Sequence, residues 1–474
     1  MKNKLLTISK IGLLAFTILV SQACQEDYEM VDPPMITDYD DDLDEEVVLQ
    51  KGLESYFVTQ FGEGDMDGTS WDQAMDVAGF RKLLSGSIDL SKSTIYMSQG
   101  KYVMSETGGL GVIIRKDIKA IKGGYSLLSE GTDLTNRRID TYKTVISGDV
   151  NGNNQADSGD CGLLLVKGGI IGIEGVTFQY GYLSNNDAKS NECGSGIYIN
   201  GNVNSTSVEL TDCIIRDCKT EAVNGQGGVA GGTAILIASG SSKLNNVKFL
   251  DNAADSRGGA IRCNSNKAVV FMNNCLITGN SVRELFGVGI QISSGHICMN
   301  NTTIVGNPGK GAALNGGGSF MLANSTIVGH DIDQEYGAFR CETSIDGDTK
   351  FINNLLISEN STAPSFILNG ANKEAYSMGY NLYQRVNNFT MGVSDTAYPT
   401  LVNGNLTEEG VYKWNIDQIG QVGGYATKQA VINAVKSFNP AASPMVNLGE
   451  VFVEWMGEDP DKMQMGAYDA VLSN

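Results

Sequence analysis

A short motif that opens with asparagine or aspartate recurs through the middle of the chain and limits the folds available to it. The copies open at Asp212, Asn246, Asn274, Asn301, Asn324 and Asn354, which are 34, 28, 27, 23 and 30 residues apart. Their fourth positions are all large and apolar: Ile215, Phe249, Ile277, Ile304, Ile327 and Ile357. A second motif, glycine and small residues before a strand-like segment, lies between the copies, as in GGAIRC at 258–263. Self-similarity at a period of roughly twenty to fifty residues predicts a solenoid.

The content of each repeat indicates which solenoid this is. Each unit holds two short strand patterns and no amphipathic helix, which excludes ankyrin-like and leucine-rich repeats. A right-handed parallel β-helix fits, because each turn of its coil pairs with the next about 4.8 Å further along. Asparagine tolerates left-handed backbone at a corner and can form ladders of side-chain amide bonds when stacked. We therefore predict an all-β, single-stranded right-handed parallel β-helix with asparagines at its corners and apolar residues in its bore.

The first residues predict export and lipidation. Lys2, Lys4 and Lys10 accompany an apolar stretch at 11–20, which has the length of a signal-peptide core and is short for a membrane span. Small residues then lead to Cys24, which resembles the acylated cysteine of a bacterial lipoprotein signal. The alternative is an ordinary secretory signal with an incidental cysteine. We expect Cys24 to carry acyl chains such as palmitate, which would hold the protein at a membrane.

An acidic segment follows this cysteine. Residues 25–50 contain eleven Asp or Glu and no Lys or Arg, so we predict a disordered tether that repels itself and cannot build a core. Acids soon after a lipidated cysteine resemble the export signal of surface lipoproteins in the Bacteroidetes, which implies a protein on the outer face of the outer membrane. A solvated spacer without a targeting role is the other interpretation. The net charge of −20 argues against nucleic acid as a partner.

The repeat resembles that of right-handed β-helix proteins, among them the polymorphic outer-membrane proteins of chlamydiae and surface proteins of the Bacteroidetes. Residues 67–84 look like the helical cap that opens such domains, and 442–449 and 463–470 look like their closing motif. The predicted parts are a signal peptide at 1–24, a tether at 25–50, an N-terminal cap with the first coils at 51–145, the β-helix core at 146–385, and C-terminal coils with a cap at 386–474. Because this scaffold hosts lyases, hydrolases, adhesins and inert stalks, the resemblance implies a fold and leaves the activity open.

One outward column of the glycine-led strands is a candidate ligand-binding face. The column is predicted to run through Tyr198, Leu236, Arg262, Gln291, Leu314 and Arg340. Tyrosine can stack on a sugar ring, and arginine can donate paired hydrogen bonds to an anionic or neutral sugar. The candidate residues for binding a polysaccharide or host glycan are Tyr198, Arg262, Gln291 and Arg340. The two leucines favour the alternative, a solvated face with scattered large side chains.

The segment DVNGNNQADSGD at 149–160 is a candidate calcium loop. Its oxygen-bearing side chains alternate at Asp149, Asn151, Asn153 and Asp157, which resembles the start of a calcium-binding loop. The glycine is not at the EF-hand position and no glutamate closes the loop, which favours an Asx-rich turn without metal. If calcium binds there, we expect a structural role. No other cofactor is expected.

The sequence supplies no clear catalytic constellation. Polysaccharide lyases on this fold need a Lys or Arg base and an acidic metal cluster. Four basic residues gather between Arg257 and Arg283, but no matching carboxylates lie on adjacent turns. We therefore assign no catalytic residue and expect an adhesin-like surface lipoprotein that binds glycan or another surface ligand. A polysaccharide lyase or other carbohydrate-active enzyme, and a structural component of an outer-membrane complex, are the alternatives.

The cysteines of the repeats are predicted to fill the bore. Cys213 and Cys275 share a repeat position two turns apart, which is too far for a disulfide, so we interpret such cysteines as small apolar residues. The sequence leaves two disulfides open, namely Cys193–Cys218 and Cys263–Cys298.

Overall fold

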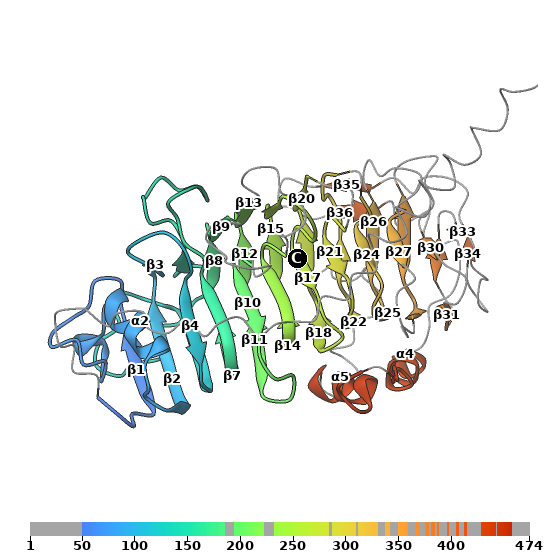
Figure 1. Ribbon diagram of the computed structural model, residues 1–474. Coiled ribbons are helices and arrows are strands. Elements are labelled where there is room, and N and C mark those ends of the chain that lie inside the picture. The colour runs from blue at the N-terminus through green and yellow to red at the C-terminus, as the bar shows by residue number, and fades with distance from the viewer. Residues whose placement is uncertain are drawn as a thin grey trace, which may run out of the picture. The chain divides into compact units, whose positions relative to one another are not determined.

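The computed structural model is a coil of short parallel strands (Figure 1). It describes residues 50–184, 194–221, 232–283, 287–309, 311–329, 337–341, 349–358, 366–368, 375–378, 381–383, 386–387, 396–397, 404–406, 412–414, 428–441 and 443–456. All of these residues belong to one compact unit, Val47–Asn474. Cys24 and most of the acidic segment lie outside the described residues. Within the described part of the chain, no helix has the length and apolarity needed to cross a membrane.

In the part of the chain that the structure describes, the parallel strands form four sheets along the coil. Sheet 1 contains β1 (Ser55–Val58), β2 (Leu90–Ser98), β5 (Ile118–Tyr125), β7 (Leu164–Glu174), β11 (Thr206–Thr211), β14 (Ile235–Asn245), β18 (Ala268–Asn273), β22 (His296–Asn300), β25 (Ser319–Ala323), β28 (Thr349–Ile352) and β31 (Ala375–Ser377). Sheet 2 shares the long strands β7 and β14 and adds β4 (Val112–Arg115), β10 (Ile197–Asn200), β17 (Ile261–Cys263), β21 (Ile290–Ile292), β24 (Leu314–Gly316), β27 (Phe339–Cys341), β30 (Phe366–Leu368) and β33 (Val386–Asn387).

The remaining strands form two further sheets and a hairpin. Sheet 3 contains β3 (Gly100–Val103), β6 (Thr144–Ser147), β8 (Thr177–Gln179), β12 (Ile214–Arg216), β15 (Lys248–Leu250), β19 (Leu276–Thr278), β23 (Thr303–Ile304), β26 (Thr326–Gly329), β29 (Leu355–Ser358), β32 (Leu382–Tyr383) and β34 (Thr396–Ala397). The short sheet 4 contains β9 (Tyr182–Ser184), β13 (Lys219–Glu221), β16 (Ala253–Ala254) and β20 (Ser281–Val282). Strands β35 (Gly404–Leu406) and β36 (Tyr412–Trp414) form an antiparallel hairpin.

Equivalent residues of successive coils stack on one another, as the repeat predicts. Phe249 pairs with Ile277, and Ile277 pairs with Ile304, in the parallel register of sheet 3. These side chains are fully buried in the bore. The last copy of the motif is an exception, because Ile327 pairs with Leu356 rather than with Ile357. The prediction for that copy was therefore wrong by one residue.

The asparagine that opens each copy occupies a left-handed corner. The φ angles are 52° at Asp212, 53° at Asn246, 54° at Asn274, 47° at Asn301, 50° at Asn324 and 58° at Asn353, so the last copy opens at Asn353 and not at Asn354. The predicted ladder is present: the side-chain amide of Asn246 donates to the Asp212 carboxylate at 2.5 Å, and that of Asn301 donates to the Asn274 carbonyl at 2.6 Å. The sequence therefore places the first five of these residues correctly, because few other side chains tolerate this backbone.

A second corner, which follows sheet 3, contains a ladder inside the coil. Asn252, Asn280 and Asn307 point inward and are buried. The side-chain amide of Asn280 donates to the Asn307 side chain at 3.0 Å and to the Phe249 carbonyl at 2.9 Å. Its side-chain oxygen accepts from the backbone N–H of Asn252 at 3.1 Å and from the Asn252 amide at 2.8 Å. One buried side chain thus satisfies backbone groups of neighbouring coils, which would otherwise be costly to bury.

The N-terminal cap is confirmed. After the 3₁₀ turn η1 (Trp71–Gln73), helix α2 (Val77–Ser85) begins at Asp76, whose carboxylate accepts from the backbone N–H of Gly79 at 2.8 Å. The helix buries Phe80, Leu83 and Leu84 in the same core as the bore. It therefore covers the apolar end of the first coil.

The C-terminal helices lie in a different place from the one predicted. Helices α4 (Lys428–Lys436) and α5 (Leu448–Met456) pack on the outer face of sheet 1, beside β18 to β28, rather than over the end of the bore (Figure 1). Phe271 of β18 contacts Phe452 with ring centroids 5.4 Å apart. Strands β33 and β34 lie in the part after residue 385 where we expected C-terminal coils, and they carry the coil to Ala397.

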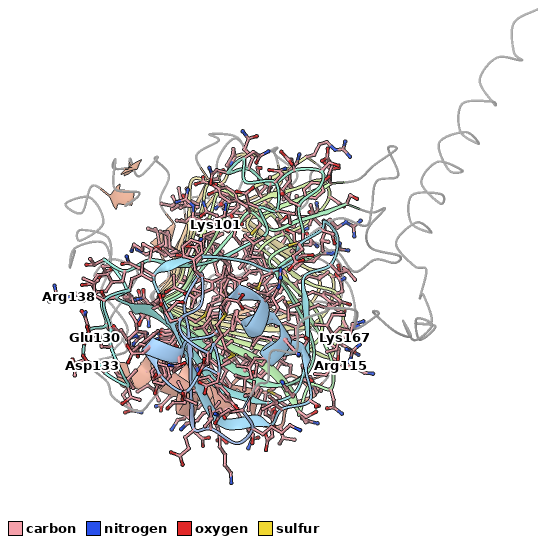
Figure 2. The ribbon with its side chains drawn as sticks, turned by 90° about the vertical axis from the view of Figure 1, so that its left-hand side faces the viewer. Lys101, Arg115, Glu130, Asp133, Arg138 and Lys167 are labelled. Carbon is pink, nitrogen blue, oxygen red and sulfur yellow. The ribbon has the colours of Figure 1, made fainter. Side chains whose placement is uncertain are left out.

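The outer face of sheet 1 is covered at its other end too. The rings of Phe57, Trp71, Tyr96 and Tyr125 form a cluster on β1, β2 and β5, and the indole N–H of Trp71 donates to the Asp133 carbonyl at 2.8 Å. Figure 2 shows the charged side chains of this end, with Glu130, Asp133 and Arg138 on one side and Arg115 and Lys167 on the other. Both ends of sheet 1 thus have a cover on their outer face.

Candidate functional site

The predicted binding column exists, with one correction. Tyr198, Leu236, Arg262 and Gln291 are consecutive partners across β10, β14, β17 and β21. Gln291 then pairs with Asn315, which pairs with Arg340. The prediction of Leu314 was wrong, because Leu314 pairs with Ile290 on the bore side.

This column is buried rather than open to a glycan. Tyr198 and Gln291 are each 3% exposed and Arg262 is 8% exposed, while Arg340 is partly buried. The glycine-rich segment before each strand lies over the neighbouring strand: a Cβ at Gly232 would lie 2.6 Å from that of Arg262. The side-chain oxygen of Gln291 accepts from the backbone N–H of Gly287 at 2.9 Å. The expectation of an accessible face is therefore wrong, because the column holds these turns in place.

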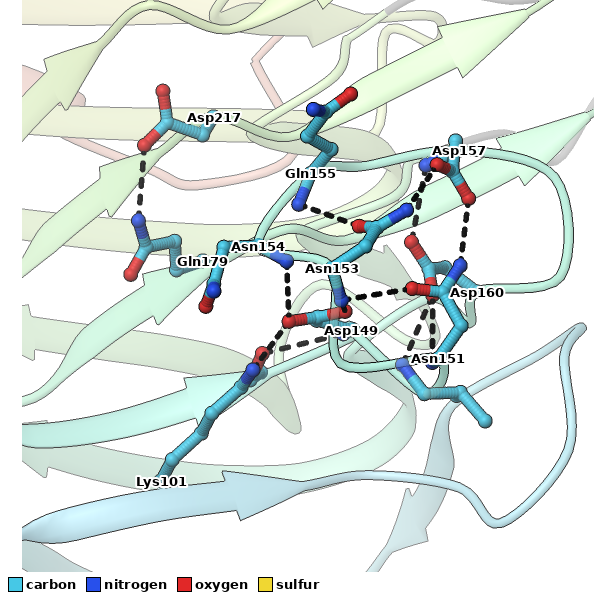
Figure 3. Close-up of polar contacts among 12 residues, drawn as sticks. Lys101, Asp149, Asn151, Asn153, Asn154, Gln155, Asp157, Asp160, Gln179 and Asp217 are labelled. Carbon is cyan, nitrogen blue, oxygen red and sulfur yellow. Dashed lines mark hydrogen bonds and ion pairs between the residues drawn. The ribbon is translucent and has the colours of Figure 1, made fainter.

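The candidate calcium loop lies between β6 and the next corner (Figure 3). The carboxylate of Asp149 is buried, forms an ion pair with Lys101, and accepts from the backbone N–H groups of Asn153 and Asn154, each at 3.0 Å. Burial opposes the ionisation of Asp149, but the Lys101 ammonium and the backbone donors outweigh burial and lower its pKa. The base of the loop is thus held by one buried carboxylate.

The rest of the loop is closed by bonds among its own side chains. The amides of Asn151 and Asn153 donate to the Asp157 carboxylate at 2.9 and 2.6 Å. The Asp160 carboxylate accepts from the backbone N–H groups of Val150 at 2.9 Å and Asp157 at 3.0 Å, and burial raises its pKa. Among the residues that the structure describes, no group of three or more His, Cys, Asp or Glu side chains could hold a metal ion. Calcium binding by this loop stays a prediction.

Tyr180, which no motif in the sequence pointed to, lies beside this loop. Tyr180 follows β8 with a φ of 59°, a left-handed conformation that costs a bulky residue about 1–2 kcal/mol. The equivalent corner positions of later coils are Asp217, Asp251, Gly279 and Gly306. An alignment of FQYG at 178–181 with FLDN at 249–252 places Tyr180 opposite Asp251 and would have shown that a tyrosine occupies this corner. Tyr180 is thus the bulky member of a column otherwise built from aspartate and glycine.

The surroundings of Tyr180 are polar and partly exposed. The Lys101 ammonium lies 6.0 Å from the centroid of the Tyr180 ring. The amide of Gln179 donates to the Asp217 carboxylate at 3.0 Å (Figure 3). The Arg216 guanidinium donates to the same carboxylate at 2.6 Å. Partial burial, together with the Asp217 carboxylate, raises the pKa of Tyr180. A partly exposed ring thus lies near an amide, a carboxylate and two cations, a set that can stack on and hydrogen-bond to a ligand.

The cysteines and histidine of the described residues are structural. Cys263, Cys298 and Cys218 are free and buried, which excludes the Cys263–Cys298 disulfide and leaves Cys218 unbridged; Cys193 lies outside the described residues. Burial raises the pKa of the Cys213 thiol to about 12, so it is a bore residue rather than a nucleophile. His296 is buried on β22.

The comparisons with known proteins agree with the coil. Residues 145–332 match a family model described as a right handed beta helix region. A search of solved structures found the crystal structure of pectate lyase Pel9A, with a TM-score of 0.30 and 12% sequence identity over 70% of this chain and 81% of that chain. A search of curated proteins found no match. The family match supports the right-handed parallel β-helix, and the pectate lyase is too distant to bear on activity.

Proposed function

We propose that this protein is a lipid-anchored β-helix on the outer face of the outer membrane and that it binds a glycan on the side of its coil without catalysis. The signal-like N-terminus, Cys24 and the acidic segment support the location. The right-handed coil supports a rigid scaffold that presents side chains at regular intervals. Catalysis is left out of the proposal because the sequence supplies no clear catalytic constellation.

The observation that carries the binding proposal is the open outer face of sheet 3. From β3 to β23, the outward side chains of this sheet other than Ser147 stay partly or fully exposed, and the polar ones include Lys101, Thr177, Gln179, Arg216, Lys248, Thr278 and Thr303. The outer face of sheet 2 is mostly buried, and that of sheet 1 is covered at both ends. An extended ligand that follows the coil would therefore meet sheet 3. The exposed side chains there can donate and accept hydrogen bonds with sugar hydroxyls.

The binding proposal is tested with the mature chain purified from membranes in detergent. We expect it to bind a subset of polysaccharides on a glycan array and to release no ultraviolet-absorbing unsaturated uronate from pectic, alginate or glycosaminoglycan substrates. Release of such products would show lyase activity and overturn the non-catalytic proposal. An array without a bound glycan would overturn the binding proposal.

The location is tested in cells by replacing the predicted lipidation residue. We expect Cys24→Ala to move the protein out of the membrane fraction and to abolish incorporation of a clickable palmitate analogue. Protease added to intact cells should digest the wild-type protein. Full protection from the protease in intact cells, with digestion after lysis, would place the protein on an inner face and contradict the surface location.

A further inference from the structure

We propose that Tyr180 is the stacking platform of a subsite for a neutral hexose, with Gln179, Asp217 and Arg216 as its hydrogen-bonding groups. The inference rests on the proposed glycan binding and gives it a place and a ligand class. The subsite lies at the corner after sheet 3, where β8 and β12 end and where the loop 149–160 leaves the coil.

The first argument is the backbone of Tyr180. Its φ of 59° is unfavourable for a bulky side chain, and equivalent positions are filled by Asp251 and by glycines at 279 and 306. At these other corners, the chain therefore has aspartate or glycine, which tolerate a positive φ. Residues held in sparsely populated backbone conformations concentrate at ligand-binding sites, where the surrounding structure compensates for the strain. A strained tyrosine with a partly exposed ring points to a role other than folding.

The second argument is the set of groups beside the ring. A hexose presents an apolar C–H face, which packs on an aromatic ring, and hydroxyls, which both donate and accept hydrogen bonds. Gln179 and Asp217 are linked by a 3.0 Å hydrogen bond, and Arg216 donates to Asp217 at 2.6 Å, so these three planar groups are pre-oriented. Their remaining donor and acceptor positions can meet hydroxyls at little cost in side-chain entropy.

The third argument is the position of the loop 149–160 directly beside Tyr180. A Cβ at Gly148 would lie 2.4 Å from the Tyr180 carbonyl oxygen, so the loop begins directly beside the tyrosine. The buried carboxylate of Asp149 ties the loop to Lys101 and to its own backbone. Asn154 and Gln155 are exposed on this loop and carry amides suited to sugar hydroxyls (Figure 3).

The charges favour a neutral sugar over a uronate. Both cations near the ring are already paired, Lys101 with Asp149 and Arg216 with Asp217. Asp157 adds a further carboxylate in the loop, and the whole chain carries a net charge of −20. An anionic polysaccharide would therefore be repelled at long range, and the two cations that the structure describes near the ring are both paired with carboxylates.

The test compares variants of the full mature chain by calorimetric titration with cellohexaose, mannohexaose, maltohexaose and hexagalacturonate. Tyr180→Asn removes the ring and suits the left-handed backbone, Tyr180→Phe keeps the ring, and Tyr142→Asn removes a partly exposed tyrosine elsewhere. We expect a neutral hexaose to bind more tightly than hexagalacturonate. We expect Tyr180→Asn to weaken that binding by about tenfold, and the other two variants to bind within about threefold of wild type.

The outcomes separate this inference from the function that it rests on. Wild-type affinity in Tyr180→Asn, while a glycan still binds, would remove Tyr180 from the site and leave glycan binding intact. Tighter binding of hexagalacturonate would overturn the neutral-hexose assignment. Binding of no glycan by the wild-type chain, here and on the array, would overturn the proposed function itself. The Tm of Tyr180→Asn should equal or exceed that of wild type; a lower Tm would show that the ring serves packing and would contradict the argument from strain.

Discussion

The corner after sheet 3 is built in two ways along the coil. In later coils the inward residue is asparagine, at 252, 280 and 307, and its side chain bonds to the backbone of neighbouring coils. In earlier coils the equivalent inward residues are Cys161, Gly181 and Cys218. Their backbone carbonyls accept hydrogen bonds from the backbone N–H groups of Tyr182, Lys219 and Ala253, respectively, in the next coil. The early corner also contains the 149–160 loop and a tyrosine. The insertion and the bulky residue thus both lie in the coils where the inward asparagine is absent.

The largest expected effect is at the regular corner. Asn280→Leu would leave the backbone N–H of Asn252 and the carbonyl of Phe249 without their buried partner, so we expect the free energy of unfolding to fall by about 2–4 kcal/mol. Urea unfolding followed by circular dichroism measures this loss. A change below about 0.5 kcal/mol would mean that the ladder adds nothing to stability and that regular stacking does not depend on it.

The next effect is at the irregular corner. Asp149→Ala removes the buried partner of Lys101 and the acceptor of two backbone N–H groups, so we expect a loss of about 2 kcal/mol at pH 7. The pKa of Asp149 is lowered in the fold, so its stabilisation is present above the ordinary pKa of about 3.9 and disappears as the pH falls through its folded pKa. The gap between wild type and variant should therefore shrink below about pH 4.

The control for this pH dependence is Asp157→Ala, which removes a carboxylate that only side chains of the same loop contact through their amides. We expect this variant to lose less stability than Asp149→Ala at pH 7. A gap between Asp149→Ala and wild type that widens in acid would contradict the lowered pKa.

A smaller effect is expected when a tyrosine is introduced at the equivalent corner position of a later coil, which contains the inward asparagine. Asp251→Tyr places a bulky side chain at a φ of 55°, so we expect a loss of about 1–2 kcal/mol from backbone strain. The matched control, Asp251→Asn, should be close to neutral because asparagine tolerates this conformation. Equal stability of the two variants would show that the corner accommodates tyrosine without strain and would weaken the case for a special role of Tyr180.

The smallest effect is expected at the exposed ladder. Asn246→Gly removes the 2.5 Å bond to Asp212 but keeps a residue that accepts the left-handed backbone. Because Asn246 is exposed, we expect a loss of less than about 0.5 kcal/mol. Thermal unfolding compares it with Asn280→Leu. A loss as large as that of the buried variant would show that the exposed rung matters as much as the inner one.

Much of the fold could be predicted because its cause is local and repeated. An asparagine at a left-handed corner and an apolar residue three positions later recur in register, so an alignment of the copies predicts which residues stack. The doublet Asn353–Asn354 misled the alignment, because either residue could open the motif and only the pairing of Leu356 with Ile327 decides between them. The GAALNG segment was misaligned by one residue for a similar reason, because small residues carry little register information.

The candidate site could be predicted only in part. The loop at 149–160 stands out in the sequence because its Asx residues alternate, but the sequence does not reveal that its oxygens are taken up by amides and backbone N–H groups. The Tyr198 column was predicted from the alternation of inward and outward residues along the strands. This alternation distinguishes bore residues from outward residues, but it does not show which segments cover the outward face. The turn at Gly232 that buries Arg262 is a contact between coils and leaves no periodic signal.

The sequence by itself determined that the chain winds into a stacked coil, because each winding repeats the same corner and the same inward residue. Tertiary structure decided which flank of the coil meets solvent: helices α4 and α5 pack onto sheet 1, glycine-rich turns cover sheet 2, and sheet 3 is left open from β3 to β23 only. The physical reason is that winding follows from residues close together in the sequence, whereas coverage depends on contacts between segments far apart in the chain.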